Sequence, residues 1–181
     1  MRYALIYGVI AGALAIGLIL MSMVLELPDH FHSEWFGYLL MLAALSLTFV
    51  GVKRYRDVER GGVIRFGPAL GLGLGIAVVA GLIYVLGFEI FLATTDPQFL
   101  DKYMGDYIAG LARDMRAEGA APAEIQAKVA EIEGMAASYK NNLLFRMAFT
   151  FIEIFPVGLI VALVSAAILR NPRMLPMRAT A

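Results

Sequence analysis

Four stretches of this chain are apolar over about the length of a membrane-spanning helix, and this feature constrains the fold most strongly. A helix needs about 20 mostly apolar residues to cross the roughly 30 Å hydrocarbon core of a bilayer. The stretches cover residues 3–25, 35–52, 66–92 and 143–169. Of the 181 residues, 60% are hydrophobic and 17% are charged, which also departs from ordinary soluble domains. We expect an all-α membrane protein with four transmembrane helices, forming a single membrane domain over residues 1–181.

Lys and Arg are distributed unevenly between the connections that join these segments. Residues 53–65 contain five basic side chains and residues 170–178 contain three more, whereas residues 26–34 contain none. Short loops rich in Lys and Arg stay on the cytoplasmic side of a membrane. We therefore expect both termini in the cytoplasm, and the long connection at residues 97–140 on the opposite side.

That long connection contains two amphipathic patterns. Apolar side chains recur at steps of three and four over residues 100–115 and again over residues 125–139, which predicts two helices. The first pattern consists of Leu100, Met104, Tyr107, Leu111 and Met115. Residues 95–97 have the composition of a helix start, with proline at the first helical position, and residues 119–122 interrupt the pattern. We expect a helical hairpin at about residues 97–140; a helix lying flat in the headgroup layer is the alternative.

The connection between the second and third segments combines both signs of charge with a glycine pair. Its candidate contact residues are Arg54, Arg56, Asp57, Glu59, Gly61 and Gly62. The two glycines favour a tight turn with positive φ. Two interpretations of the charges stay open. They are a topology signal that also anchors the loop at lipid headgroups, or a docking surface for a cytoplasmic partner.

The same connection resembles a known family. The similar residues are Tyr55-Arg56-Asp57, Glu59, Gly61-Gly62, Ile64 and Phe66-Gly67, followed by Asp96-Pro97, Tyr103, residues 121–124, Phe151, Glu153, Phe155-Pro156 and Gly158-Leu159. Over nearly its whole length the chain is similar in this way to domain-of-unknown-function family 4199. The resemblance implies a small bacterial protein with four membrane helices, so we expect it in the cytoplasmic (inner) membrane. It supplies no catalytic residue, because the family has no established activity.

Glu89 and Glu153 are ionisable side chains inside apolar segments, where such groups are costly and often functional. At about 1.5 Å per residue, both fall in the half of the membrane opposite to the cytoplasm. If they share a cavity, their repulsion favours a shared proton or a bound cation. The alternative is structural: Glu89 extends to the interface, and Glu153 pairs with Arg146 on the same helix face. Pro156 removes a backbone hydrogen bond and predicts a kink beside Glu153.

His30 and His32 lie with Asp29 and Glu34 in one short connection. Imidazole and carboxylate groups bind zinc or copper, so the two histidines form a candidate metal site. The alternative is a solvated loop beside Trp35. Cysteine is absent, and neither a nucleophile motif nor a phosphate-binding loop occurs. We therefore predict no cofactor and no enzymatic activity.

Glycines recur at every fourth position on two of the apolar segments. Gly8 and Gly12 lie on the first segment, and Gly67, Gly71 and Gly75 lie on the third. Small residues at this spacing let helices approach closely in lipid. Packing within one chain is the favoured interpretation, and a homodimer is the alternative.

Two functions follow from these features. The first is a structural or accessory membrane protein that binds a membrane-protein partner or membrane lipid. The alternative is a small proton- or cation-coupled transporter, or a channel-like protein, that uses Glu89 and Glu153. The net charge of zero argues against a nucleic-acid partner.

Overall fold

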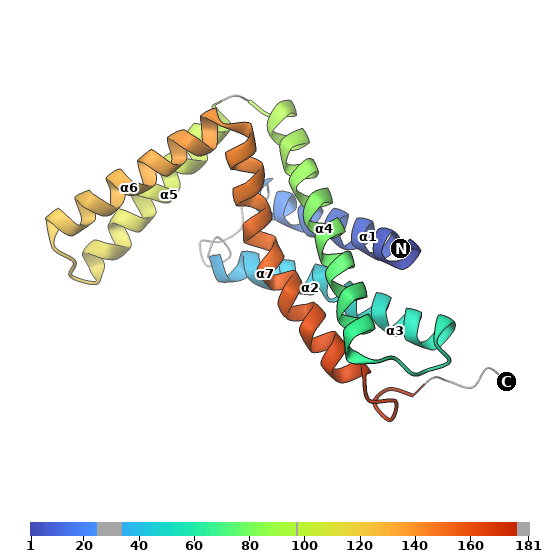
Figure 1. Ribbon diagram of the computed structural model, residues 1–181. Coiled ribbons are helices and arrows are strands. Elements are labelled where there is room, and N and C mark those ends of the chain that lie inside the picture. Colours follow the sequence, from blue (N-terminus) through green and yellow to red (C-terminus); the bar gives the residue numbers. More distant parts are fainter. Residues whose placement is uncertain (25–33, 97, 177–181) are drawn as a thin grey trace. The chain divides into compact units, whose positions relative to one another are not determined.

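The computed structural model describes residues 1–24, 34–96 and 98–176, and every regular element in these residues is an α-helix (Figure 1). The helices are α1 (Arg2–Val24), α2 (Glu34–Leu45), α3 (Leu47–Glu59), α4 (Phe66–Thr94), α5 (Phe99–Ala117), α6 (Pro122–Asn141) and α7 (Leu143–Leu169). The candidate metal residues His30 and His32 lie outside the described residues.

Within the described residues, four helical segments are long and apolar enough to cross a membrane. They are Arg2–Ser22, Trp35–Glu59, Phe66–Thr94 and Leu143–Leu169. The prediction of an all-α protein with four membrane-length helices is therefore confirmed, and the four segments fit a multi-pass membrane protein.

The second of these segments is longer than its apolar core, and it is divided. The helix continues past Val52, the predicted end, as far as Glu59. Lys53 donates to Asp57 four residues on, at 2.5 Å, and such i,i+4 pairs stabilise a helix through charged sequence. A turn at Ser46 separates α2 from α3, and the Ser46 hydroxyl donates to the Ala43 carbonyl at 2.6 Å. Serine side chains that bond to the preceding turn compete with the helix in this way.

The chain forms two compact units. Unit 1 consists of Met1–Phe88 and Phe151–Ala181, and unit 2 consists of Glu89–Thr150. Unit 1 therefore contains α1, α2, α3, most of α4 and most of α7. Unit 2 contains α5 and α6 together with the last turn of α4 and the first turns of α7.

Small side chains are prominent among the buried residues of unit 1, beside larger ones such as Leu45 and Ile76. Ala11 and Ala15 of α1, Ala80 of α4, and Ala162 and Ala166 of α7 are all buried. In lipid, helices associate mainly by close van der Waals packing, which small residues permit. A methyl group in place of hydrogen would clash at several glycines, so the backbones are as close as glycine allows.

The predicted glycine stripes divide into contacting and open positions. A Cβ at Gly12 would lie 2.5 Å from the Ala80 carbonyl oxygen, and one at Gly8 would lie 2.5 Å from Val79 Cβ, so α1 packs tightly on α4. Gly75 faces Ala4 at 3.3 Å. Around Gly67 and Gly71, apart from chain neighbours and the backbone of the same helix, no atom of the described residues lies within 4 Å of the added methyl. Sequence spacing alone had not distinguished these two groups.

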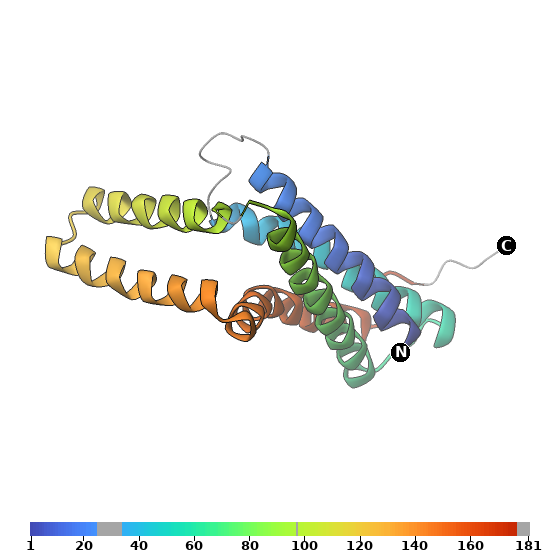
Figure 2. The same cartoon turned by 90° about the horizontal axis from the view of Figure 1, so that it is seen from above.

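Unit 2 is organised around two antiparallel helices that lie side by side (Figures 1 and 2). Gly119, at φ +83°, turns the chain after α5, and Pro122 occupies the first turn of α6. Between the two helices, Ala112 of α5 and Ile125 and Ile132 of α6 are buried. Lys140 at the end of α6 donates to both carboxylate oxygens of Asp101 on α5, each at 2.7 Å.

Two details of α5 differ from the sequence prediction. The helix begins at Phe99, with Gln98 as its N-cap, and the Asp96 carboxylate accepts a hydrogen bond from the Gln98 backbone N–H at 2.8 Å. Tyr107, which belongs to the predicted apolar stripe, is 41% exposed. The buried position on α5 is Ala112, whose small side chain permits a closer approach to α6 than tyrosine would.

Candidate functional site

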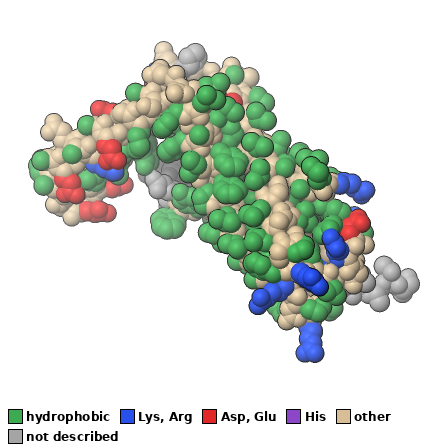
Figure 3. All heavy atoms as spheres, viewed as in Figure 1, with side chains coloured by type: hydrophobic (Ala, Val, Ile, Leu, Met, Phe, Trp, Pro, Cys, Tyr) green, Lys and Arg blue, Asp and Glu red, His purple; other side chains and the backbone are tan. Residues whose placement is uncertain are grey.

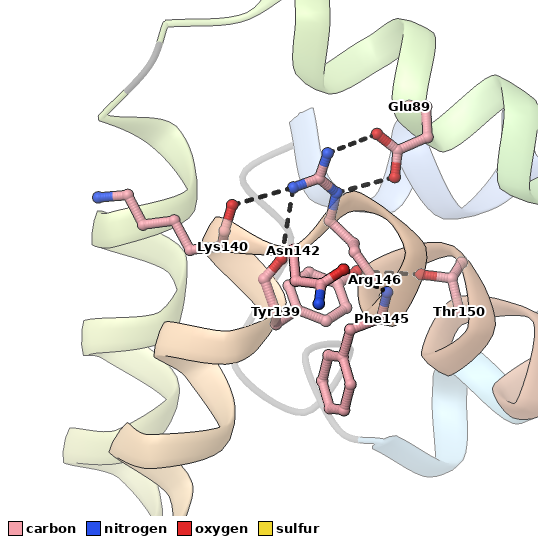
Figure 4. Close-up of polar contacts among 7 residues, drawn as sticks. All are labelled: Glu89, Tyr139, Lys140, Asn142, Phe145, Arg146 and Thr150. Carbon is pink, nitrogen blue, oxygen red and sulfur yellow. Dashed lines mark hydrogen bonds and ion pairs between the residues drawn. The ribbon is translucent and has the colours of Figure 1, made fainter.

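A bidentate ion pair joins the end of α4 to the start of α7 inside unit 2 (Figure 4). Arg146 Nε donates to Glu89 Oε1 at 2.8 Å, and Arg146 Nη2 donates to Glu89 Oε2 at 2.7 Å. The two side chains are 15% and 18% exposed. Two parallel charge-assisted hydrogen bonds in this geometry are among the stronger polar contacts in proteins.

The third nitrogen of the same guanidinium caps helix α6. Arg146 Nη1 donates to the backbone carbonyls of Tyr139 and Lys140, at 3.3 and 3.2 Å. The last carbonyls of a helix have no partner within the helix, and they carry the negative end of its dipole. A positive charge at this position therefore completes the hydrogen bonding of α6 while it neutralises Glu89.

Asn142 places Arg146 where it can make these contacts. Its extended backbone, with φ −124° and ψ 104°, separates α6 from α7, and its side chain accepts the Phe145 N–H at 3.1 Å as an N-cap. Arg146 then falls in the first turn of α7, directly beside the end of α6. The Tyr139 hydroxyl bonds with the Thr150 hydroxyl at 3.1 Å and fixes the same corner from the other side.

A hollow of about 240 Å³ lies beside this corner. Its polar lining residues are Glu89, Asp96, Lys140 and Arg146. Lys140 is paired with Asp101 and Arg146 with Glu89, and Asp96 accepts the Gln98 N–H, so each of the four charged groups already has a contact within the fold. The arrangement joins four helix ends and leaves little uncompensated charge for chemistry.

In the structure Arg146 pairs with Glu89, whereas the alternative considered from the sequence is a pair between Arg146 and Glu153. Glu89 belongs to unit 2 and Glu153 to unit 1, where its side chain is exposed on α7 and makes a contact of its own. The shared-proton hypothesis needs a carboxylate available for exchange, and Arg146 holds Glu89 through both oxygens. Helix α7 runs uninterrupted through Pro156.

A second charged cluster lies in unit 1, around Arg56 of α3. Arg56 is fully buried, with 0% of its surface exposed. Its Nη1 and Nη2 donate to the carbonyls of Met174 and Leu175, at 3.0 and 2.5 Å, and its Nε donates to Asp57 at 2.7 Å. Asp57 also accepts from Lys53. Because a buried charge must be paired, Arg56 fixes the segment that follows α7 against α3.

Other residues at the end of α3 and in the α3–α4 connection make contacts close to Arg56. Glu59 accepts a hydrogen bond from the Tyr3 hydroxyl at 3.1 Å, which links α1 to the same end of the unit. Gly61 and Gly62 have φ +60° and +85°, as the predicted turn requires, and the Gly62 N–H donates to the Arg56 carbonyl. Arg54 is exposed.

The comparison with protein families gives one result. The family described as "Protein of unknown function (DUF4199)" matches residues 2–171, which is almost the whole chain. The chain is a DUF4199 protein. This confirms the resemblance drawn from the α3–α4 connection and from α7. No curated protein and no solved structure matches the chain.

The Glu89–Arg146 cluster of this DUF4199 protein could be predicted from the sequence in part, and the Arg56 cluster could not. Glu89 and Arg146 were both noted from the sequence as charges in or beside apolar segments, although not as partners. The contacts of Arg56 with the segment after α7 were not predicted, because the charges of this connection indicate either a topology signal or a docking surface. The nearest sequence signal is that Arg56 and Asp57 belong to the motif shared with the family.

Proposed function

We propose that this DUF4199 protein is a non-enzymatic accessory protein of the bacterial inner membrane, and that it binds a membrane-protein partner through the α5–α6 pair. The pair would lie on the side opposite to the cytoplasm, as the distribution of Lys and Arg favours. The observation that carries the proposal is an exposed aromatic and sulfur-containing surface on these two helices, which we call the tyrosine face and define as Tyr103, Tyr107 and Met135.

The three residues of the tyrosine face come from both helices. They are 44%, 41% and 41% exposed, respectively. Ile108 and Ala136 line the seam between α5 and α6, and Tyr107 and Met135 directly precede them. In two antiparallel right-handed helices, positions that precede a contact residue by one lie on the same side of the pair. Tyr103 lies one turn before Tyr107 and extends the face along α5.

The chemistry of this face suits a protein more than a lipid surface. Tyrosine and methionine are enriched in protein interfaces, where a tyrosine buries a rigid ring and keeps a hydroxyl for hydrogen bonding. Residues 99–141 contain seven carboxylates and five basic side chains, a net charge of −2. An anionic membrane surface does not attract such a segment. In the view of Figure 3, Asp and Glu side chains predominate on these helices, with a small area of Lys or Arg among them.

The Glu89–Arg146 pair supports the proposal that α5 and α6 form a preformed element for binding a partner. Arg146 contacts the last carbonyls of α6 and Glu89 of α4, so within unit 2 these three helix ends are joined to one another by side-chain hydrogen bonds. A rigid element loses less conformational entropy when it binds. The same pairing disfavours the transporter alternative, which requires Glu89 to exchange protons or cations.

Site-specific photocrosslinking in native membranes tests the proposal. A photoreactive amino acid is placed at Tyr107 in one protein and at Ala109 in another; Ala109 is exposed on the same helix but lies on the other side of the pair. We expect a discrete protein adduct from position 107 and none from position 109. Equal adducts from both positions, or lipid adducts only, would refute a protein-binding role for the tyrosine face.

A further inference from the structure

One end of unit 1 carries a concentration of positive charge that the structure gathers from three separate parts of the chain. Exposed arginines come from the start of α1, from α3 and the α3–α4 connection, and from the segment after α7. They are Arg2, Arg54, Arg60, Arg65, Arg170 and Arg173, and we call this set the basic end. Figure 3 shows Lys and Arg side chains gathered there around an apolar surface.

Contacts inside unit 1 hold these three parts together. Tyr3 of α1 donates to Glu59 of α3 and stacks edge-on against Tyr55, with ring centroids 5.4 Å apart. Arg56 binds the Met174 and Leu175 carbonyls, which places the segment after α7 beside α3. The basic end is therefore one folded surface, on which arginines from separate segments are held together by contacts.

The carboxylates at this end are already occupied. Asp57 is bound by Lys53 and Arg56, and Glu59 accepts from Tyr3. In the described part of the chain, none of the six exposed arginines forms an ion pair with a carboxylate; Arg60 contacts the ring and hydroxyl of Tyr55. Eight basic side chains, including Lys53 and Arg56, thus face two carboxylates across these segments.

We propose that the basic end binds the headgroup phosphates of anionic phospholipids. The arginines lie where apolar membrane-length helices end, which is the depth of the headgroup phosphates in a bilayer. Guanidinium groups bind phosphate oxygens in a bidentate geometry. Basic clusters beside membrane helices attract anionic lipid with an energy that grows with each Lys or Arg. The inference goes beyond the proposed protein partner, because it concerns another surface and another ligand.

Native mass spectrometry of the full-length protein with added lipid tests this inference. Phosphatidylglycerol is titrated against phosphatidylcholine, which has the same chains and no net charge. The test variant is Arg54→Gln/Arg65→Gln/Arg173→Gln, which changes one arginine of α3, one of the α3–α4 connection and one of the segment after α7. The control is Lys102→Gln/Arg113→Gln/Arg116→Gln, which removes three exposed charges from α5.

The wild type and the control are expected to retain phosphatidylglycerol in preference to phosphatidylcholine. The test variant should bind phosphatidylglycerol about tenfold or more weakly. Added salt should release phosphatidylglycerol from the wild type, a measurement that needs no variant to fold. Equal retention of both lipids, equal loss in the control, or displacement by the same concentration of glycerol 3-phosphate would overturn the assignment. The crosslinking at Tyr107 does not depend on any of these outcomes.

Discussion

The Glu89–Arg146 pair gives the sharpest quantitative prediction. Removing one partner of a buried ion pair costs about 3–5 kcal/mol, whereas a fully exposed pair contributes about 0–1 kcal/mol. With side chains 15% and 18% exposed, the pair lies between these limits. We expect Glu89→Gln to lower the free energy of unfolding by about 2 kcal/mol, because it leaves the guanidinium without its counter-charge.

Arg146→Gln should be more damaging than Glu89→Gln. It also removes the donors to the Tyr139 and Lys140 carbonyls, and these are worth about 1 kcal/mol more. In a double-mutant cycle, the coupling energy between the two positions should be about 2 kcal/mol, since the double variant loses the pair only once. Glu133→Gln, at an exposed carboxylate of α6, is the matched control and should change stability by less than about 0.5 kcal/mol.

The assay is reversible unfolding of the purified protein in detergent or in nanodiscs, followed by circular dichroism. Hydrogen exchange at residues 139–147 adds local information, because loss of the cap should speed exchange at this corner before the rest of unit 2. The reasoning is refuted if Glu89→Gln is as stable as the wild type, or if the coupling energy is close to zero. Stable Glu89→Gln protein that has lost ion-dependent flux in proteoliposomes would instead support the transporter alternative.

Three further predictions concern the packing of α1 on α4, the contacts of Arg56, and the ion pair between Lys140 and Asp101. Gly12→Ala should destabilise the protein by about 2 kcal/mol or more, because the methyl would meet the Ala80 carbonyl, while Gly71→Ala should be neutral or stabilising; thermal melts compare the two. Arg56→Gln should release the segment after α7, so limited proteolysis should cut near residue 174 several-fold faster than in the wild type. Lys140→Ala should lower the free energy of unfolding by less than about 1 kcal/mol, because the ion pair that it removes is half exposed. High salt screens this pair, so the difference from the wild type should disappear there, and thermal melts at two salt concentrations test this.

The membrane-length helices could be predicted from sequence because their signal is local. Length and apolar composition decide whether a helix can span a bilayer, and neither depends on neighbours. The continuation of α3 to Glu59 was missed for the same reason: hydropathy locates apolar residues, and residues 53–59 are helical through their propensity and the Lys53–Asp57 pair.

The polar contacts could not be predicted, because they depend on how helices meet. Glu89 and Arg146 are 57 residues apart, and their pairing requires that the start of α7 lie beside the end of α4. In sequence Arg56 is one of several charges in a short connection, and nothing local shows that it is buried and bonded to the carbonyl of Met174 after α7. Tyr107 shares the apolar spacing of α5, but only the contact with α6 shows which side is covered.

The central claim is that the α5–α6 pair binds a protein through the tyrosine face. Native mass spectrometry of complexes released directly from the membrane tests it, with Tyr107→Ser compared with Ala109→Ser at wild-type expression. We predict that the wild type and Ala109→Ser carry an additional protein at fixed stoichiometry, and that Tyr107→Ser has lost it while its helix content is unchanged. An unaccompanied chain in all three samples, or a partner retained by Tyr107→Ser, would contradict the claim.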